Sequence, residues 1–593
     1  MSHPLHPTAF RPSGTTLLLA SLIAGLVGTS ATAAPPDAGS LLNQQQALPQ
    51  PLKRLPTPAE STGVRPAQGG AGAATVRVQS VRITGAEGLA TEAELNAVVQ
   101  SAIGQETDFD GLQQLAEQVS RYLVGKGWLL AQAYLPQQDL TAGALEIAVQ
   151  QSRIEGNAQG DGVQVKPGAQ LRLSPERIRK TVGTAVLRDT TQTPHSDALE
   201  RAVLLINDLP GVNASSHLAR GTTPNTTQIG IEANEGALLS GSAWVDNYGN
   251  RYTGAWRTSL MASLNNPSHQ GDQATLMLTA ANGTNVGRVG YSLPLGYSGL
   301  RAQAYFSSMS YAIGEEQAAQ NSTGKSDTYG LGLSYPLLRK RESNLSINLN
   351  YDNKALQDKT LGAVTRDKQL DNMSLGLSGD RYDRLLGGGL NNFMLTHTSG
   401  QLNLDRNATD AANDKTSGKT QGGFQKLTYS AARLQRLTDE TSLFAAINGQ
   451  AATQNLDSSE KFILGGPSGV RAYPGGEASG DRGWIGNLEV RRDLPAARKL
   501  GWGDVQLLAF YDVGQIGLQA NPWMAAPNAT ASNSYQLDGV GLGLNLSKPG
   551  KYTVRLTWAQ TLGDNPGRSV ANDANSDGLK DNQRLWFFAS INL

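Results

Sequence analysis

Apolar and polar residues alternate with a period of two through the C-terminal part of the chain, from about residue 236 onwards. In NLSINLNY (344–351) every second side chain, from Leu345 to Tyr351, is apolar, and the side chains between them are Asn or Ser. KYTVRLTW (551–558) repeats this pattern. Such alternation predicts β-strands with one apolar and one polar face. The alternating segments begin at about residues 240, 254, 271, 286, 299, 326, 343, 369, 390, 423, 439, 482, 503, 537, 551 and 584.

These segments predict a mainly β fold, a transmembrane β-barrel of about 16 strands that spans residues 236–593. An even number of strands, many of them near ten residues long, is typical of an outer-membrane barrel with an apolar outer surface and a polar lumen. A large soluble β-sandwich or β-helix has alternating strands as well, and it is the alternative at this point.

The start of the chain indicates export. An apolar run, Leu17 to Val27, follows Arg11 and precedes TSATAAPP, and it is too short for a transmembrane helix. A basic start, a short apolar segment and a small-residue site such as Ala31-Thr32-Ala33 together form a secretory signal. Residues 1–33 are therefore predicted to be a signal peptide, with an ordinary buried helix as the alternative.

Residues 34–75 are predicted to be a polar linker, because PPDAGSLLNQQQALPQPLKRLPTPAE and GGAGAA are rich in Pro, Gln, Gly and Ala. A short helix around Leu41 to Leu48 is the one element expected there, and it is a candidate plug for the barrel.

Between residues 76 and 235, helical and strand patterns follow one another twice. VRVQSVRITG reads as a strand, TEAE (91–94) as a capping box that begins a helix, and a second helix is expected from about Asp110. WLLAQAYLP and ALEIAVQ then complete a small α+β domain at 76–155. In 156–235, Ser174-Pro175 is expected to open a helix as its cap and first-turn proline, SDALERAVLLINDLPGV to supply another helix, and QIGIEANEG to end the domain as a strand.

Composition removes several classes of function. The 593 residues include 50 Lys plus Arg, 50 Asp plus Glu and no Cys. Balanced charge argues against a nucleic-acid partner, and the lack of cysteine excludes disulfides, thiolate metal sites and a cysteine nucleophile. The six His and the scattered Ser show no spacing typical of a catalytic triad, and no Lys-Ser/Thr follows GGPSG as a phosphate-binding loop requires. We therefore expect no enzyme activity and no cofactor.

Two stretches, GKGWLLAQAYLPQQDLTAGALEIAVQQSRIEG (125–156) and LERAVLLINDLPGV (199–212), resemble the polypeptide-transport-associated (POTRA) domains of the haemolysin secretion/activation proteins, the transporters of two-partner secretion. VDNYGNRYTGAWR, NNPSHQGDQ and YSLPLGYSGLRAQAYFSSMSY resemble the opening strands of the barrel in that family. The resemblance implies two periplasmic POTRA domains that capture an unfolded partner by edge-strand addition, with client-free adaptor domains as the alternative. Leu593 departs from the aromatic residue that commonly ends such barrels.

A glycine-rich stretch, GGPSGVRAYPGGEASGDRG (465–483), contains an arginine that calls for a partner. Counting strands from a periplasmic N-terminus places residues 451–481 on the extracellular side, between strands 11 and 12. VRAY, which is Val470-Arg471-Ala472-Tyr473, resembles the VRGY motif of a family loop that folds back into the lumen. Ala472 departs from the glycine of that motif and requires a backbone angle that alanine adopts.

The carboxylate partner is predicted from strand parity. In VQLLAFYDVGQ (505–515) the apolar positions leave Phe510, Asp512 and Gly514 facing the lumen, and these residues resemble the F-x-D-x-G motif of the family. An unpaired guanidinium in a narrow pore is costly, so Arg471 and Asp512 are predicted to form a latch. The alternatives are a solvated loop charge at Arg471 and an unpartnered pore-lining carboxylate at Asp512.

DANSDGLKD (573–581) matches the first half of a calcium loop, but its twelfth position is Arg584 instead of a bidentate Glu. An ordinary polar external loop is therefore the favoured interpretation, and no metal site is assigned.

Together these features predict an outer-membrane translocator that captures one large exported partner protein in the periplasm and secretes it through the barrel. The expected partner is haemolysin- or adhesin-like and extended β-helical, and lipid of the outer membrane surrounds the barrel. A barrel-assembly insertase of the same superfamily, which more POTRA domains would favour, and a passive porin, which leaves residues 76–233 unexplained, are the alternatives.

Overall fold

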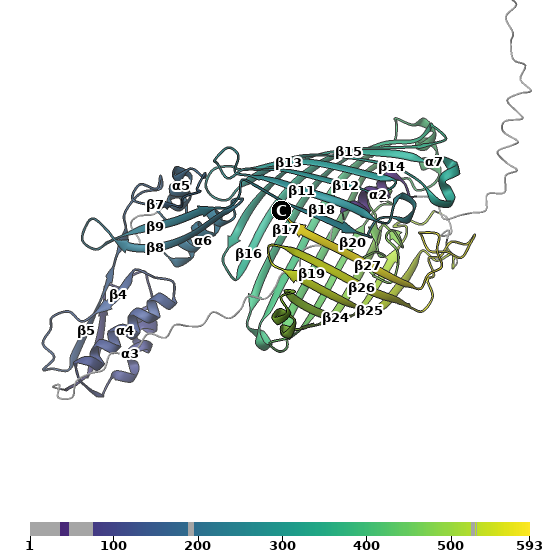
Figure 1. The fold of residues 1–593 in the computed structure, drawn as a ribbon. Helices are drawn as coiled ribbons and strands as arrows, with labels where there is room; N and C mark the ends of the chain where they lie inside the picture. The colour runs from purple at the N-terminus through teal and green to yellow at the C-terminus, as the bar shows by residue number, and fades with distance from the viewer. Residues whose placement is uncertain (1–35, 47–74, 188–194, 524–527, 529) are drawn as a thin grey trace, which may run out of the picture.

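A computed structural model describes residues 36–46, 75–187, 195–523, 528 and 530–593. A short helix, two small α+β units and a large barrel follow one another along the chain, and the two units lie at one end of the barrel (Figure 1). The predicted signal peptide and most of the predicted linker lie outside the described residues. None of the described helices is long and apolar enough to cross a membrane.

The first unit packs two helices on a three-stranded sheet with the order β2-β5-β4. Its elements are β1 (Val76–Arg77), β2 (Ser80–Thr84), α3 (Glu92–Val99), η1 (Gln100–Ala102), β3 (Glu106–Thr107), α4 (Phe109–Gly125), β4 (Ala131–Tyr134) and β5 (Ala144–Gln151). Helix α3 begins with the expected capping box, in which the Thr91 backbone N–H donates to the Glu94 carboxylate at 2.9 Å. Buried apolar residues of α4, such as Val119, close a core within this unit.

The second unit packs two helices on a sheet centred on β9, which pairs with β6 and β7 along one edge and with β8 along the other. Its elements are β6 (Arg153–Ile154), β7 (Gln164–Pro167), α5 (Pro175–Val186), α6 (Ser196–Asn207), β8 (Val212–Arg220) and β9 (Thr226–Glu235). Helix α5 begins at Pro175 as expected, but the Ser174 side chain makes no capping hydrogen bond. The expected cap was wrong in this respect: the Ser174 backbone N–H instead donates to the His269 carbonyl in a barrel turn.

Sixteen antiparallel strands close the barrel, because the last strand, β27, pairs with the first, β10. The strands are β10 (Leu239–Asp246), β11 (Arg257–Asn265), β12 (Gln273–Ala280), β13 (Thr284–Pro294), β14 (Arg301–Ala312), β15 (Thr323–Arg339), β16 (Ser343–Thr360), β17 (Ala363–Asp383), β18 (Gly389–Asn403), β19 (Gly422–Arg436), β20 (Thr441–Ala452), β23 (Arg482–Asp493), β24 (Asp504–Gly517), β25 (Ser534–Lys548), β26 (Tyr552–Leu562) and β27 (Gln583–Asn592). Side chains alternate as predicted: Tyr329 on β15 is 59% exposed on the outer surface, whereas its neighbour Thr328 is 2% exposed. The predicted 16-stranded barrel is confirmed.

Some strands are longer than their alternating patterns. β15, β16 and β17 contain 17, 18 and 21 residues, whereas crossing the membrane takes about 9–11. β17 begins at Ala363 instead of about residue 369, because its first residues, AVTRDKQ, lack a continuous apolar face. Short helices occur in the barrel connections: η2 (Arg251–Thr253), η3 (Glu315–Gln320), η4 (Leu385–Gly387), α7 (Ala408–Thr416), η5 (Ser458–Glu460) and η6 (Pro495–Leu500).

The second unit is fixed to the turns at one end of the barrel. Arg339, at the end of β15, donates from Nε and Nη2 to the two Asp208 carboxylate oxygens at 2.9 and 2.7 Å. Arg177 of α5 donates to the Gly296 carbonyl at 2.8 Å, and Arg201 of α6 donates to the Pro336 carbonyl at 2.7 Å. Polar contacts therefore set the orientation of this unit at the barrel entrance.

We expect Arg339→Asp to lower the protection of the second unit against trypsin about two- to fivefold, because a partly exposed ion pair contributes roughly 0.2–1 kcal/mol and the variant places two carboxylates together. The rate of limited trypsin cleavage within residues 156–235, normalised to the amount of folded barrel, measures the effect. Adding Asp208→Arg is expected to restore part of the loss. The control is Arg492→Asp, which reverses an exposed pair with Glu440. A double variant no better than Arg339→Asp contradicts the proposed orienting role.

Candidate functional site: the closed barrel lumen

The connection between β20 and β23, residues 453–481, folds back into the lumen and is called the long loop below. It contains η5 and the short strands β21 (Phe462–Ile463) and β22 (Ser479–Gly480). Val470 and Tyr473 of its tip are 0% and 1% exposed, and they belong to one apolar cluster with Phe510 of β24. An apolar patch of the barrel wall thus holds the tip inside the barrel.

Small residues allow this close packing. A Cβ atom on Gly514 would lie 3.0 Å from Leu464 Cδ2, and one on Gly539 of β25 would lie 2.5 Å from Ala472 Cβ. The backbone angle φ of Ala472 is not positive. The alanine therefore fits the backbone of the loop without strain, and glycine is needed instead on the facing wall.

Arg471 is the centre of the polar contacts of the tip. Its Nε and Nη2 donate to Asp512 Oδ2 and Oδ1 at 2.8 and 2.7 Å, and its backbone N–H donates to Oδ2 at 3.1 Å. The guanidinium carbon lies 3.5 Å from the centroid of the Phe510 ring. Asp512 is 0% exposed, so the bidentate contact neutralises a fully buried carboxylate. The structure therefore brings the two predicted motifs together.

Four further residues complete this contact, and the sequence analysis missed them. Glu489 Oε1 accepts from Arg471 Nη1 at 2.7 Å, and the other Glu489 oxygen accepts from Arg491 at 2.7 Å. Asn487 donates to Asp512 Oδ1 at 2.7 Å, and Trp586 Nε1 donates to the Arg471 carbonyl at 2.7 Å. The pairing of neighbouring strands could have indicated Glu489. It lies directly opposite Phe510 across β23 and β24, and therefore on the same face of the wall as Phe510.

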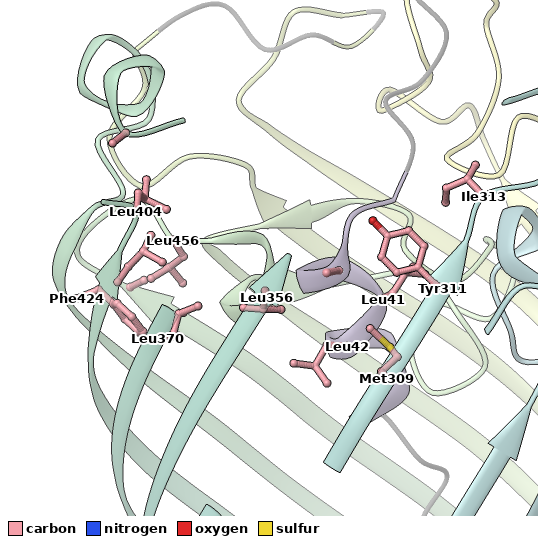
Figure 2. Close-up of a cluster of buried hydrophobic side chains, with 14 of the residues drawn as sticks. Leu41, Leu42, Met309, Tyr311, Ile313, Leu356, Leu370, Leu404, Phe424 and Leu456 are labelled. Atoms are coloured by element: carbon pink, nitrogen blue, oxygen red, sulfur yellow. The ribbon is translucent and has the colours of Figure 1, made fainter. Parts of the chain in front are cut away.

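Helix α2 (Ala38–Gln46) also lies inside the lumen, near the end opposite the two α+β units (Figure 1). Leu41 and Leu42 are 2% and 6% exposed and pack in a cluster with Met309, Tyr311 and Leu356 of the wall (Figure 2). The helix begins earlier than the expected Leu41, because the Asp37 carboxylate accepts from the Ser40 backbone N–H at 2.8 Å and satisfies its first turn. Among the described residues, two segments of the chain therefore occupy the lumen.

The stretch 573–581 packs on the long loop. Asp577 lies 2.6 Å from Arg584, and Asn575 Oδ1 accepts from Asn565 at 3.0 Å, so protein groups take the oxygens that a calcium ion needs. Glu477 of the long loop accepts from the Ser576 backbone N–H at 2.6 Å, and burial raises the pKa of this carboxyl. Within the described ranges, no three His, Asp or Glu side chains are grouped to hold a metal ion. This stretch is instead part of the external loop between β26 and β27, and it holds the long loop in place.

The fold and the lumen define a class of protein, the outer-membrane transporters in which POTRA domains precede a 16-stranded barrel. Residues 225–546 match the family model described as haemolysin secretion/activation protein ShlB/FhaC/HecB, and residues 76–152 match the POTRA domain, ShlB-type. The chain belongs to this haemolysin secretion/activation family.

Individual relatives agree with this assignment. The heme/hemopexin transporter protein HuxB of Haemophilus influenzae is 29% identical over 80% of this chain and 81% of its own length. The outer membrane transporter CdiB of Dickeya dadantii is 24% identical over 74% of this chain and 78% of its own length. The solved structure of CdiB from Escherichia coli superposes with a TM-score of 0.68 at 20% identity, covering 95% of this chain and all of that one, which shows the shared fold.

The chain is thus a two-partner secretion transporter of the outer membrane, with its POTRA region in the periplasm. The family is one of transporters and not a class of enzymes.

Proposed function

We propose that the chain captures one large, haemolysin- or adhesin-like partner protein in the periplasm and passes it unfolded through the barrel. In the resting state α2 and the long loop fill the lumen, and both are displaced during transport. The domains that capture the partner are residues 76–155 and 156–235, and Arg471, Asp512 and Glu489 form the latch that holds the long loop.

The observation that carries this proposal is the way the two lumenal segments are held. Both belong to the chain itself, and each meets the wall through ion pairs and hydrogen bonds as well as apolar contacts, such as those of Arg471 and Asp37. Water and the polar side chains of a passing chain can replace such contacts one at a time. This supports a barrel that opens reversibly without a nucleotide.

An exposed strand edge supports capture by strand addition. Among the described residues β8 pairs only with β9, and the side chains from Ser216 to Arg220 are all exposed. An unpaired edge of this length offers main-chain donors and acceptors to an extended segment of the partner. The partner thus adds to β8 before it enters the barrel.

The two alternatives have less support. A passive porin needs an open lumen, whereas here α2 and the long loop occupy it. A barrel-assembly insertase shares this architecture, but the family match is to secretion proteins.

The experiment uses a Gram-negative host without related transporters, in which the chain is expressed with a candidate partner, the large exported protein that we expect the neighbouring reading frame to encode. We expect the partner in the culture medium only when the chain is present in the outer membrane. A partner that stays in the periplasm beside a heat-modifiable, correctly inserted barrel contradicts the proposal. Improved insertion of other barrels by the chain, without secretion, favours the insertase.

A further inference from the structure

A second group of buried ion pairs lies in the lumen where the stem of the long loop, residues 457–461, meets the wall. Glu460 accepts from Lys354 Nζ at 2.6 Å and lies 2.8 Å from Lys426 Nζ. Asp457 accepts from Lys368 Nζ at 2.5 Å. The Lys368 side chain is 3% exposed, so its charge depends on protein carboxylates. These pairs fix the stem to β16, β17 and β19, at a part of the wall distinct from the Arg471 contacts.

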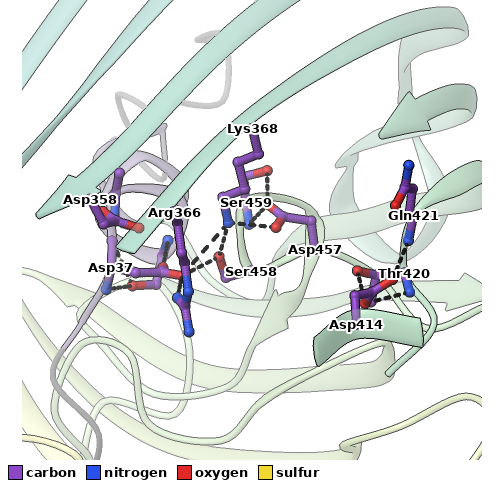
Figure 3. A network of polar contacts seen from close by, with 12 residues as sticks. Asp37, Asp358, Arg366, Lys368, Asp414, Thr420, Gln421, Asp457, Ser458 and Ser459 are labelled. Carbon is purple, nitrogen blue, oxygen red and sulfur yellow. Dashed lines mark hydrogen bonds and ion pairs between the residues drawn. The ribbon is translucent and has the colours of Figure 1, made fainter. Parts of the chain in front are cut away.

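The same stem forms part of the binding site of α2 (Figure 3). Asp37, just before the helix, accepts from Ser458 Oγ at 2.8 Å and from Arg366 Nη1 at 2.6 Å, and it lies 3.7 Å from Lys368 Nζ. The Asn43 side chain donates to the Lys461 carbonyl at 2.5 Å. The helix therefore rests on the stem as well as on the wall.

The contact between helix and stem leaves no spare room at Gly39. A Cβ atom at this position would lie 2.4 Å from Ser458 Oγ and 2.8 Å from the Ser459 backbone N. Glycine normally weakens a helix, so its use here is explained by the close approach of the stem.

We infer that Lys368 is a positioning residue that ties α2 to the stem, so that the helix and the long loop leave the lumen as coupled elements. Its ammonium lies between two carboxylates from separate segments, Asp37 and Asp457. Departure of the helix removes the acceptor of Ser458 and the contact at Gly39, which weakens the stem. Departure of the stem removes one side of the helix site, and such a coupling is reciprocal.

This inference rests on the proposed function only in that both elements move, and its test needs no partner protein. The purified full-length chain is inserted into planar lipid bilayers, where departure of α2 is recorded as ion conductance. Lys368→Met is expected to increase the frequency of open events several-fold, toward that of a chain lacking residues 38–46. Lys368→Arg keeps the charge and is expected to stay close to the unmodified chain. The control Arg288→Met removes a charge that stacks on Tyr305, away from helix and stem.

The reverse direction is measured by trypsin cleavage at Lys461 of the stem. Deleting residues 38–46 is expected to speed this cleavage several-fold, while cleavage at the exposed Lys499 of η6 stays constant. Gly39→Ala separates helix propensity from the packing of the helix on the stem. Alanine favours a helix and would by itself hold α2 in place, but its methyl group collides with the stem, so we expect more open events. Heat-modifiability shows that each barrel is folded. If Lys368→Met fails to fold, Gly39→Ala still tests the coupling, because it leaves the barrel wall unchanged. Unchanged cleavage after the deletion, or a Lys368→Met record equal to that of Arg288→Met, overturns the coupling and leaves the secretion function unaffected.

Discussion

Arg471→Ala is expected to lower secretion of the partner about tenfold or more while the barrel stays assembled, because breaking a buried ion pair costs roughly 3–5 kcal/mol. The change leaves Asp512 and Glu489, whose side chains are 0% and 7% exposed, without their shared guanidinium. Lumenal substitutions spare the lipid-facing surface, so insertion into the membrane is retained. The measurement is the secreted fraction of the partner, divided by the amount of heat-modifiable barrel.

The companion variants separate the latch from a general effect of charge. Asp512→Ala is expected to match Arg471→Ala, and the double variant to be little worse than either, because both remove one contact. Arg471→Lys keeps the charge but loses the bidentate geometry, so we expect an intermediate loss. Arg471→Cys with Asp512→Cys is expected to form a disulfide under mild oxidation in this chain without native cysteine. Additive losses together with no disulfide would refute the latch.

Deletion of residues 76–233 is expected to reduce secretion to background while a heat-modifiable barrel remains in the outer membrane. The apolar cores of the two α+β units consist of their own residues, so the barrel loses the contacts at its turns, such as the hydrogen bonds of Arg177 and the stacking of Arg201 on Tyr335, and keeps its own wall. Secretion of the partner and heat-modifiability of the truncated chain measure the two outcomes. Full secretion by the truncated barrel would show that capture does not take place in this region.

A finer variant locates the capture site. Leu218→Lys places a charge on the exposed strand β8 and is expected to weaken binding of a purified 76–235 fragment to the N-terminal region of the partner. Ala169→Lys adds the same charge at an exposed turn and is the matched control. Equal binding by both variants, measured by titration calorimetry, points to a different surface.

Much of the barrel could be predicted because lipid imposes a period of two on each strand that crosses it. The same parity placed Asp512 on the lumenal side, and the family motif around Arg471 supplied its partner. Polar strand extensions such as residues 363–368 escaped the prediction, because they stand outside the lipid and show no apolar face.

The sequence by itself determined the number of barrel strands, the two helical units before them and the side of each strand that faces water, because these depend on local periodicity. Only the tertiary structure decided which distant segments meet. The Ala38 backbone N–H donates to Asp358, 320 residues away, and Asp208 pairs with Arg339, 131 residues away. The tertiary structure likewise places Lys368 between Asp37 and Asp457. Such pairs follow from closure of the barrel around α2 and the long loop, and no local pattern in the chain encodes which charge meets which.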